Sequence, residues 1–134
     1  MIPSTNTILT ADLSLDIQPS KQHRMNIERT RIAGTCDGLE AVRQTVYKIL
    51  NTERYAYIIY SWDYGVELQD LYGKNPMRVC TALERRIREA LTQDDRITSV
   101  DSFVFDTSAK GVVTVTFTVH SIFGDIEEEK KVNI

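Results

Sequence analysis

The chain has 134 residues, of which 42% are hydrophobic and 26% are charged, a mixture typical of one globular domain with a single core. Sixteen Lys and Arg against nineteen Asp and Glu give a net charge of −3, which argues against non-specific binding to nucleic acid or anionic lipid. Cys36 and Cys80 stand far apart without a CxxC motif or a Cys/His cluster, which fits a reducing compartment and argues against a zinc site.

The N-terminal part of the sequence predicts an arm followed by a domain. Residues 1–24 are rich in Ser, Thr, Asn, Asp and Gln, which predicts an extended arm with little structure of its own. They lack the basic start and apolar run of a signal peptide, and no stretch approaches the ~20 apolar residues needed to cross a bilayer, so we expect a chain that is neither exported nor inserted. Residues 25–134 are expected to form one α+β domain, in which residues 25–33 are a candidate first strand.

Two helices are predicted next. Asp37 followed three residues later by Glu40 resembles a capping box at the start of a helix over about residues 38–51. Asn75 followed by Pro76 combines a capping side chain with proline at the first helical position, which marks the start of a second helix. Apolar residues recur at helical spacing in both, at Leu39, Val42, Val46, Ile49 and Leu50 in the first and at Val79, Leu83, Ile87, Ala90 and Leu91 in the second.

Aromatic residues gather between the two helices. The run YAYIIY at residues 55–60 is dense in aromatic and β-branched side chains, which favours a buried strand. The aromatic turn that follows, Trp62-Asp63-Tyr64-Gly65, is either a plug in the core or an anchor for a partner.

The last third of the chain predicts a β-meander. Residues 97–106 and 112–120 form two strands around a loop, and the second strand alternates, with Val113, Val115, Phe117 and Val119 on one face. A turn at Gly124 and Asp125 leads into a final strand, residues 126–134, in which Ile126, Val132 and Ile134 share a side. The predicted fold is therefore α+β, with two main helices packed on a mostly antiparallel sheet that ends in this meander.

The sequence offers little material for catalysis. It has two histidines, His23 and His120, and neither a Gly-rich phosphate loop, a GxSxG elbow nor an HExxH motif. We therefore predict no catalytic residue, no cofactor and no metal ligand. A glycosidase needs only two opposed carboxylates, so a cell-wall hydrolase using a pair such as Glu53 and Asp63 stays as an alternative. Other candidate acids, Asp94 and Asp95, precede an arginine and are explained by local ion pairing, as is Glu53.

A series of short motifs over residues 44–68 carries a family resemblance. A helix with Gln44 ends in a Leu-x-Thr sequence and runs into a Glu-Arg pair, a predicted strand and an aromatic-Gly pair; the residues are Gln44, Leu50, Thr52, Glu53, Arg54, Tyr64 and Gly65. This order resembles the baseplate wedge or sheath-initiator family of contractile phage tails, historically labelled lysozyme-like, and especially its branch in prophages and phage-like particles of Gram-positive bacteria.

A second part of the match follows the later helix. Many members of that family have a Glu-Pro-Arg triplet there, which contributes to the wedge core, and this chain has Asp94, Asp95 and Arg96. The arginine and one acid are kept, whereas the proline is lost. The usual Gly before Glu53 and the Pro before the aromatic turn are also missing. The resemblance covers roughly residues 32–134.

The resemblance implies a structural subunit that is not an enzyme. Its partners would be larger baseplate wedge subunits, tail tube or hub proteins and the sheath protein, with no nucleic acid, membrane or small-molecule substrate. It would lie in the host cytoplasm during assembly and then in the tail baseplate of a virion or phage-like particle. A soluble regulator that binds an unrelated partner through the same fold is the other alternative.

The mechanism we expect is β-augmentation, in which an open edge of the C-terminal meander pairs with a sheath strand. Arg54 and Arg96 are expected to act as forks for carboxylates or carbonyls of wedge partners. Loss of residues 126–134 is expected to leave a folded domain that cannot nucleate the sheath. The predicted interface residues are Glu53, Arg54, Trp62, Asp63, Tyr64, Gly65, Asp94, Asp95, Arg96, Ile126, Val132 and Ile134.

Overall fold

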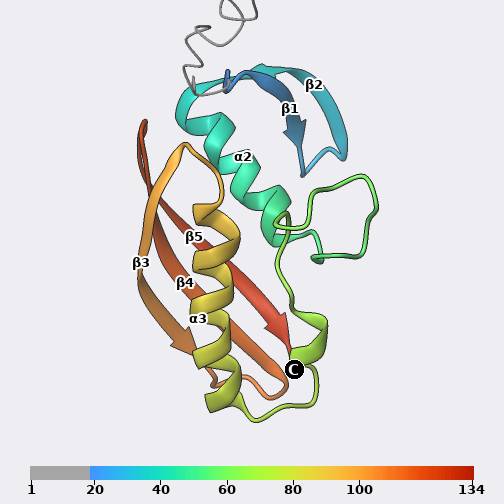
Figure 1. The fold of residues 1–134 in the computed structure, drawn as a ribbon, viewed down its shortest axis with the longest axis vertical. Helices are drawn as coiled ribbons and strands as arrows, with labels where there is room; N and C mark the ends of the chain where they lie inside the picture. Colours follow the sequence, from blue (N-terminus) through green and yellow to red (C-terminus); the bar gives the residue numbers. More distant parts are fainter. Residues whose placement is uncertain (1–18) are drawn as a thin grey trace, which may run out of the picture.

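The computed structural model describes residues 19–134, which form two helices and five strands in two antiparallel sheets (Figure 1). In chain order the elements are β1 (Gln22–Asn26), β2 (Arg31–Cys36), α2 (Gly38–Leu50), the short 3-10 helix η1 (Gln69–Leu71), α3 (Pro76–Thr92), β3 (Ile97–Asp106), β4 (Val112–Ser121) and β5 (Gly124–Asn133). The predicted α+β class with a C-terminal meander is confirmed. The predicted arm falls mostly outside the described residues, and residues 22–24, its last three, belong to β1.

Both helices begin where the sequence predicted. Asp37 caps α2 by accepting a hydrogen bond from the Gly38 N–H at 2.7 Å, and Asn75 caps α3 by accepting one from the Met77 N–H at 2.9 Å. Glu40 pairs with Arg24 at 3.0 Å. The apolar faces are buried as predicted, except that Leu39 is half-buried at the edge of the core.

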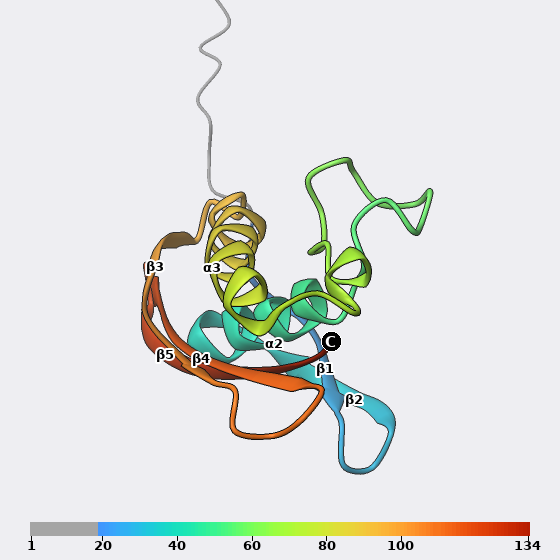
Figure 2. The ribbon, with the colours of Figure 1, turned by 90° about the horizontal axis from the view of Figure 1, so that it is seen from below.

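The meander forms one layer and the helices form the other. β4 lies between β3 and β5, and both helices lie on the same face of this sheet (Figures 1 and 2). α3 packs on β3 and β4, whereas α2 packs on β5 and on α3. The core between the layers includes Phe117, Ile49, Leu83, Ile87, Leu91 and Ile126, each at most 1% exposed. Full burial of each such side chain contributes about 1.5–3 kcal/mol.

The turn of the second hairpin lies earlier than predicted. Gly124 already pairs with Ser121, so the connection is formed by Ile122 and Phe123, and β5 begins at Gly124. The predicted single strand over residues 25–33 is also wrong. A turn at residues 27–30 divides this segment between β1 and β2, with Thr30 in the left-handed region at φ 49°.

The predicted buried strand at residues 55–60 is wrong. These residues form an irregular loop, in which Ile58 is 101% exposed and Ile59 is 81% exposed. The reason is that the chain closes on itself around this loop: Glu53 and Val66 form an isolated β-bridge at its base. Strand propensity reflects packing against neighbouring strands, and none of the strands in residues 19–134 pairs with this segment.

Neither of the helices in residues 19–134 is long and apolar enough to cross a membrane.

Candidate functional site

The loop over residues 55–64 is closed at its base by backbone hydrogen bonds. The Val66 N–H donates to the Thr52 carbonyl at 3.0 Å, and the Arg54 N–H donates to the Val66 carbonyl at 3.3 Å. Glu53 adds a second closure, because its carboxylate accepts hydrogen bonds from the backbone N–H groups of Leu68 and Gln69 at 3.0 and 3.2 Å, at the start of η1. The Glu-Arg pair of the family motif thus fixes where the loop leaves and rejoins the fold.

Arg54 and Gly65 complete this base. The Arg54 guanidinium donates to the carbonyl of Gly65 at 3.2 Å and to that of Asp63 at 3.4 Å. Gly65 has φ +92°, and a Cβ at this position would lie 2.7 Å from the Thr52 carbonyl oxygen. Only glycine fits such a conformation and such a close approach of two backbone segments. This explains the glycine at the end of the motif.

Most side chains of the loop are exposed. Tyr55 is 67% exposed and Trp62 is 86% exposed, which excludes the alternative that Trp62 plugs the core. Tyr64 packs against the core, and Tyr60 stacks on it with ring centroids 4.4 Å apart. Figure 2 shows the loop extending away from the helices and the sheet. The aromatic residues of the loop therefore form two groups: Tyr60 and Tyr64, which are stacked and anchored on the core, and Tyr55 and Trp62, which are exposed.

Arg96 is held by groups of its own chain. Its guanidinium contacts the Asp94 carboxylate at 2.8 and 3.0 Å and donates to the Thr45 hydroxyl of α2 at 3.1 Å. The Arg96 carbonyl accepts the Ile122 N–H at 3.0 Å. Burial raises the pKa of Asp94, but the hydrogen bonds and charge of Arg96 outweigh it and hold that pKa below its usual value. The acid-arginine pair thus joins α2, the α3–β3 junction and the β4–β5 turn.

Asp95 differs from its neighbours, because it is exposed whereas the Asp94 and Arg96 side chains are 12% and 13% exposed. A groove of about 300 Å³ lies over this junction and is lined by Ser20, Gln22, Thr45 and the three residues Asp94, Asp95 and Arg96, among others.

β5 is the uninterrupted edge of the meander. It pairs with β4 at every residue from Gly124 to Asn133. The Ile134 N–H donates to the Gly111 carbonyl at 2.9 Å, which continues the same register by one residue. Because the N–H and C=O groups of an antiparallel strand alternate between its two sides, the even-numbered residues of β5 bond to β4. The residues that direct these groups to the open edge are Asp125, Glu127, Glu129, Lys131 and Asn133, all with exposed side chains.

The opposite edge is irregular. β3 breaks register with β4 twice, between Ile97 and Ser99 and between Asp101 and Val104, and Ser102 has φ +57°. Bulges of this kind twist an edge and interrupt its hydrogen-bonding row. Of the two edges of the meander, β5 is therefore the one suited to accept a further strand.

Two charged side chains lie on the helix-covered face of β5. Glu128 lies 3.8 Å from Arg43, and Lys130 donates to the Asn51 side chain at 3.1 Å. Burial raises the pKa of Glu128 and lowers that of Lys130. Inward-pointing charges near an edge discourage unselective strand pairing.

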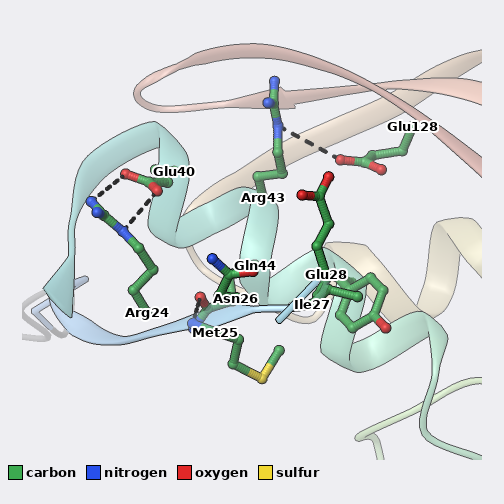
Figure 3. Close-up of a pocket in the computed structure, with 10 residues that line it drawn as sticks. Arg24, Met25, Asn26, Ile27, Glu28, Glu40, Arg43, Gln44 and Glu128 are labelled. Carbon is green, nitrogen blue, oxygen red and sulfur yellow. Dashed lines mark hydrogen bonds and ion pairs between the residues drawn. The ribbon is translucent and has the colours of Figure 1, made fainter. Parts of the chain in front are cut away.

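Grooves border the β5 edge. One of about 470 Å³ is lined by Leu68, Gln69, Tyr72 and residues 130–133. Another, of about 460 Å³, lies between the β1–β2 hairpin, α2 and Glu128 (Figure 3). In the second, Arg24 reaches Glu40 and Arg43 reaches Glu128, so its walls are charged.

The hairpin is attached to α2 by Gln44. A register shift in β1 falls between His23 and Met25. The Gln44 amide group donates to the His23 carbonyl at 2.6 Å and accepts the Met25 N–H at 2.9 Å, so it satisfies the backbone on both sides of the shift. The Gln of the family motif therefore serves as a backbone partner.

The candidate catalytic carboxylates are engaged elsewhere. Glu53 binds backbone N–H groups and Asp94 binds Arg96. Asp63 accepts a hydrogen bond from Ser61 at 2.6 Å, which lowers its pKa. A general acid needs a raised pKa, and neither Asp63 nor Asp94 has one.

The predicted site residues form separate groups. Glu53, Arg54, Asp63 and Gly65 meet at the loop base, whereas Asp94 and Arg96 form the junction pair. Ile126 and Val132 are buried in the core, so their side chains do not line the open edge. Sequence reasoning missed the exposed residues 55–60 and the edge-facing residues of β5. The sequence does hold a signal for the second group, because Ile126 and Val132 share one side of the strand and leave Glu127, Glu129 and Lys131 on the other.

Comparisons with known proteins identify the family. Residues 14–124 match the family model of the contractile injection system sheath initiator. The phage-like element PBSX protein XkdS of Bacillus subtilis (strain 168) is 38% identical over 118 residues, which cover 85% of this chain and 83% of that protein. A solved chain titled putative tail lysozyme, from Geobacter sulfurreducens, has a TM-score of 0.58 at 17% identity, covering 71% of this chain and 89% of that one, so it shares the fold. The chain belongs to the sheath initiator family of contractile injection systems.

Proposed function

We propose that this chain starts sheath assembly by offering the open edge of β5 to an extended strand of the sheath protein. The observation that carries the proposal is the uninterrupted register of β5 with β4, which leaves a regular row of outward N–H and C=O groups. Within residues 19–134 no other strand pairs with this edge. An added strand would gain a continuous backbone ladder, the usual source of affinity in β-augmentation.

Side chains beside the edge would select the incoming strand. Glu127, Glu129 and Lys131 are exposed on the face away from the helices. Opposite charges on directly facing residues stabilise a strand pair, whereas like charges destabilise it. A sheath strand with basic residues opposite the two glutamates and an acid opposite Lys131 therefore fixes the register.

Docking to larger wedge subunits is the second part of the proposal. The predicted interface residues contribute to this docking in two ways, by direct contact and by holding the contact surfaces in shape. Trp62 and Asp95 are exposed and available for direct contact. Arg54 and Arg96 hold the loop base and the junction in shape through contacts within the chain, so their contribution to docking is to present these surfaces.

Burial and strand pairing argue against the expectation that a chain lacking residues 126–134 stays folded. Ile126 and Val132 are 1% and 3% exposed, and β4 would lose its pairing partner along its whole length. Loss of two such core side chains alone costs several kcal/mol, a large part of the stability of a small domain. A test of the edge must leave the strand in place.

Proline on the open edge is such a test. Replacing Glu127 and Glu129 by proline removes two outward N–H groups and blocks an added ladder, while the bonds from even-numbered residues to β4 stay. The matched control replaces the same residues by alanine. In particles made by cells that carry only the variant, we expect tails without sheath for the proline variant and sheathed tails for the alanine variant, counted by electron microscopy.

Circular dichroism must show both variants folded. Sheathed tails at normal frequency with a folded proline variant would contradict the edge mechanism. Presence of the variant chain in the unsheathed baseplates separates a failure of sheath addition from a failure of wedge docking.

We infer that the chain is a structural component and has no hydrolase activity. Membership of a structural tail family supports this, and so do the structural bonds of Glu53 and Asp94. Purified chain is expected to release no soluble fragments from peptidoglycan. Release that is lost in Glu53→Gln would instead support the cell-wall hydrolase.

A further inference from the structure

We propose that the loop over residues 55–62 is an apolar plug that inserts into an uncharged cleft of a different tail subunit. The inference rests on the proposed function, because it names the chemistry of one wedge partner. Its starting point is an unusual surface: eight successive residues, YAYIIYSW, without a charge, in a chain that is 26% charged. The most exposed of them are Ile58 at 101%, Trp62 at 86% and Ile59 at 81%.

The size of this surface fits a protein interface. A Tyr or Trp side chain buries about 150–250 Å² when it is fully covered. The exposed parts of Tyr55, Tyr57, Ile58, Ile59 and Trp62 together are therefore of the order of the ~800 Å² that one partner buries in an ordinary interface. Isolated exposed apolar residues are common, but a contiguous group of this extent marks a binding surface.

The loop is fixed in shape before any partner binds. Its base is closed by the Glu53–Val66 bridge and by the Arg54 hydrogen bonds to Gly65 and Asp63. Above the base, Tyr57 meets Tyr60 edge-on at 6.1 Å and Tyr60 stacks on the core-packed Tyr64. Tyr55 has φ +69°, in the left-handed region, which costs free energy for any residue other than glycine. Such preorganisation reduces the entropy lost on binding.

Shape and charge define the occupant. The loop projects from the body (Figures 1 and 2), so the partner must be concave. Residues 55–62 carry no charge, and the charged residues that flank them, Arg54 and Asp63, lie at the loop base. A charged wall of the cleft facing residues 55–62 would therefore be desolvated without compensation. On residues 19–134, the grooves at the Asp94–Arg96 junction, beside β5 and beside the β1–β2 hairpin each have charged side chains in their walls. This favours a cleft of a different protein over a cleft of a second copy of this chain.

A membrane fits the surroundings of the loop less well. Next to it, a small groove is lined by Arg54, Glu67, Arg85, Arg86 and Glu89, which mix both signs. Peripheral binding to anionic lipid combines apolar insertion with a cluster of basic residues, and the chain as a whole carries −3.

The test uses full-length chain in assembled particles. A benzoylphenylalanine photocrosslinker is placed at Ile58 or at Trp62, and at Lys110 in the β3–β4 loop as the control position. After irradiation of purified particles, mass spectrometry identifies the crosslinked peptide. We expect positions 58 and 62 to crosslink to apolar residues of one other tail protein, and position 110 to give no crosslink to that site.

A matched pair of variants gives the energetic test. Ile58→Ser, Ile59→Ser and Trp62→Ser are combined in one chain, and Ile32→Ser with Met77→Ser, at side chains 67% and 80% exposed outside the loop, form the control. The loop variant should keep the thermal unfolding curve of the native chain, because it alters exposed side chains only. Its amount in purified baseplates should fall at least about tenfold, as expected for hot-spot residues, while the control stays at the native level.

Several outcomes overturn the proposal. Crosslinking from positions 58 and 62 to a second copy of this chain, flotation of the purified chain with phosphatidylcholine or phosphatidylglycerol vesicles, or normal incorporation of the loop variant would each do so. The β5 proline variant separates this failure from that of the sheath mechanism, because it should enter baseplates normally and lack sheath. Absence of the native chain from particles would overturn both proposals.

Discussion

Gly65 is the residue on which the closure of the loop depends most directly. Alanine at this position must adopt φ +92° and place its Cβ 2.7 Å from the Thr52 carbonyl oxygen, which is fixed by its hydrogen bond from the Val66 N–H. We expect Gly65→Ala to lower the free energy of unfolding by about 2–4 kcal/mol. Gly73→Ala, at φ +78° with no heavy atom within 4 Å of the new Cβ, should cost only about 1 kcal/mol. Urea unfolding checks both; equal losses would mean that the close approach is relieved elsewhere.

His120 joins the three strands of the meander on the face away from the helices. Its ring nitrogens lie 2.7 Å from Asp125 of β5 and 2.9 Å from Asp101 of β3. Hydrogen bonds that the ring donates to the carboxylates of Asp125 and Asp101 raise the pKa of His120 above its ordinary value of 6.5, and the bond to Asp101 lowers the pKa of that acid. The charged imidazolium is therefore favoured in the folded state.

The sign of the pH effect follows from this raised pKa. The stabilisation by His120 is fully present below pH 6.5 and is lost as the pH rises through the folded-state value. We expect the difference in melting temperature between native chain and His120→Gln to be largest near pH 5.5 and to shrink above neutral pH. An NMR titration of the ring protons should give a midpoint above 6.5. A midpoint at or below 6.5 would contradict the bridged geometry.

At the scale of elements, the β1–β2 hairpin depends on α2. A two-stranded hairpin alone is marginally stable in water, and Gln44 supplies bonds to the His23 carbonyl and the Met25 N–H. Gln44→Ala should cost about 1 kcal/mol locally and speed hydrogen exchange of the Met25 amide about fivefold. Glu40→Ala removes only the exposed pair with Arg24 and should leave that exchange rate nearly unchanged. Unchanged exchange in Gln44→Ala would show that the hairpin is held by other contacts.

The elements that could be predicted from the sequence are those with a repeating local signal. α3 has a cap, a proline at its first position and five apolar residues at helical spacing, and β4 alternates over its length. Residues 55–60 satisfy the same compositional rule for strands, yet they are exposed. Composition reports what a side chain would gain by burial, whereas the Glu53–Val66 bridge decides that this segment loops away from the sheet.

At the scale of the whole molecule, the Arg96–Asp94 pair connects parts that lie far apart in the sequence. Arg96→Ala leaves Asp94, 12% exposed, without its charged partner and breaks the bond to Thr45 of α2. We expect a loss of about 2–4 kcal/mol in the free energy of unfolding. The double variant with Asp94→Ala should lose less than the sum of the single variants. A loss below about 0.5 kcal/mol for Arg96→Ala would point to an external partner for this arginine.

The part of the candidate site that could be predicted from the sequence consists of motif residues whose side chains hold the fold together. Gln44, Glu53, Arg54 and Arg96 were recognised by type and order, and each bonds to a distant part of the chain. The prediction that Arg54 and Arg96 bind groups of partner proteins rests on the same motif residues. Both arginines donate hydrogen bonds to acceptors of their own chain. The sequence does not tell whether the acceptor of an arginine lies in its own chain or in a partner.

The separation between the base of the loop and its outer residues has an evolutionary consequence. The base is fixed by backbone bonds and by Glu53, Arg54 and Gly65, whereas the side chains of residues 55, 58, 59 and 62 are mostly exposed. Substitutions at those four positions leave the core and both sheets untouched. Members of the family from different particles can therefore diverge in these residues, in step with their neighbours in the assembly, while the fold of the domain is kept.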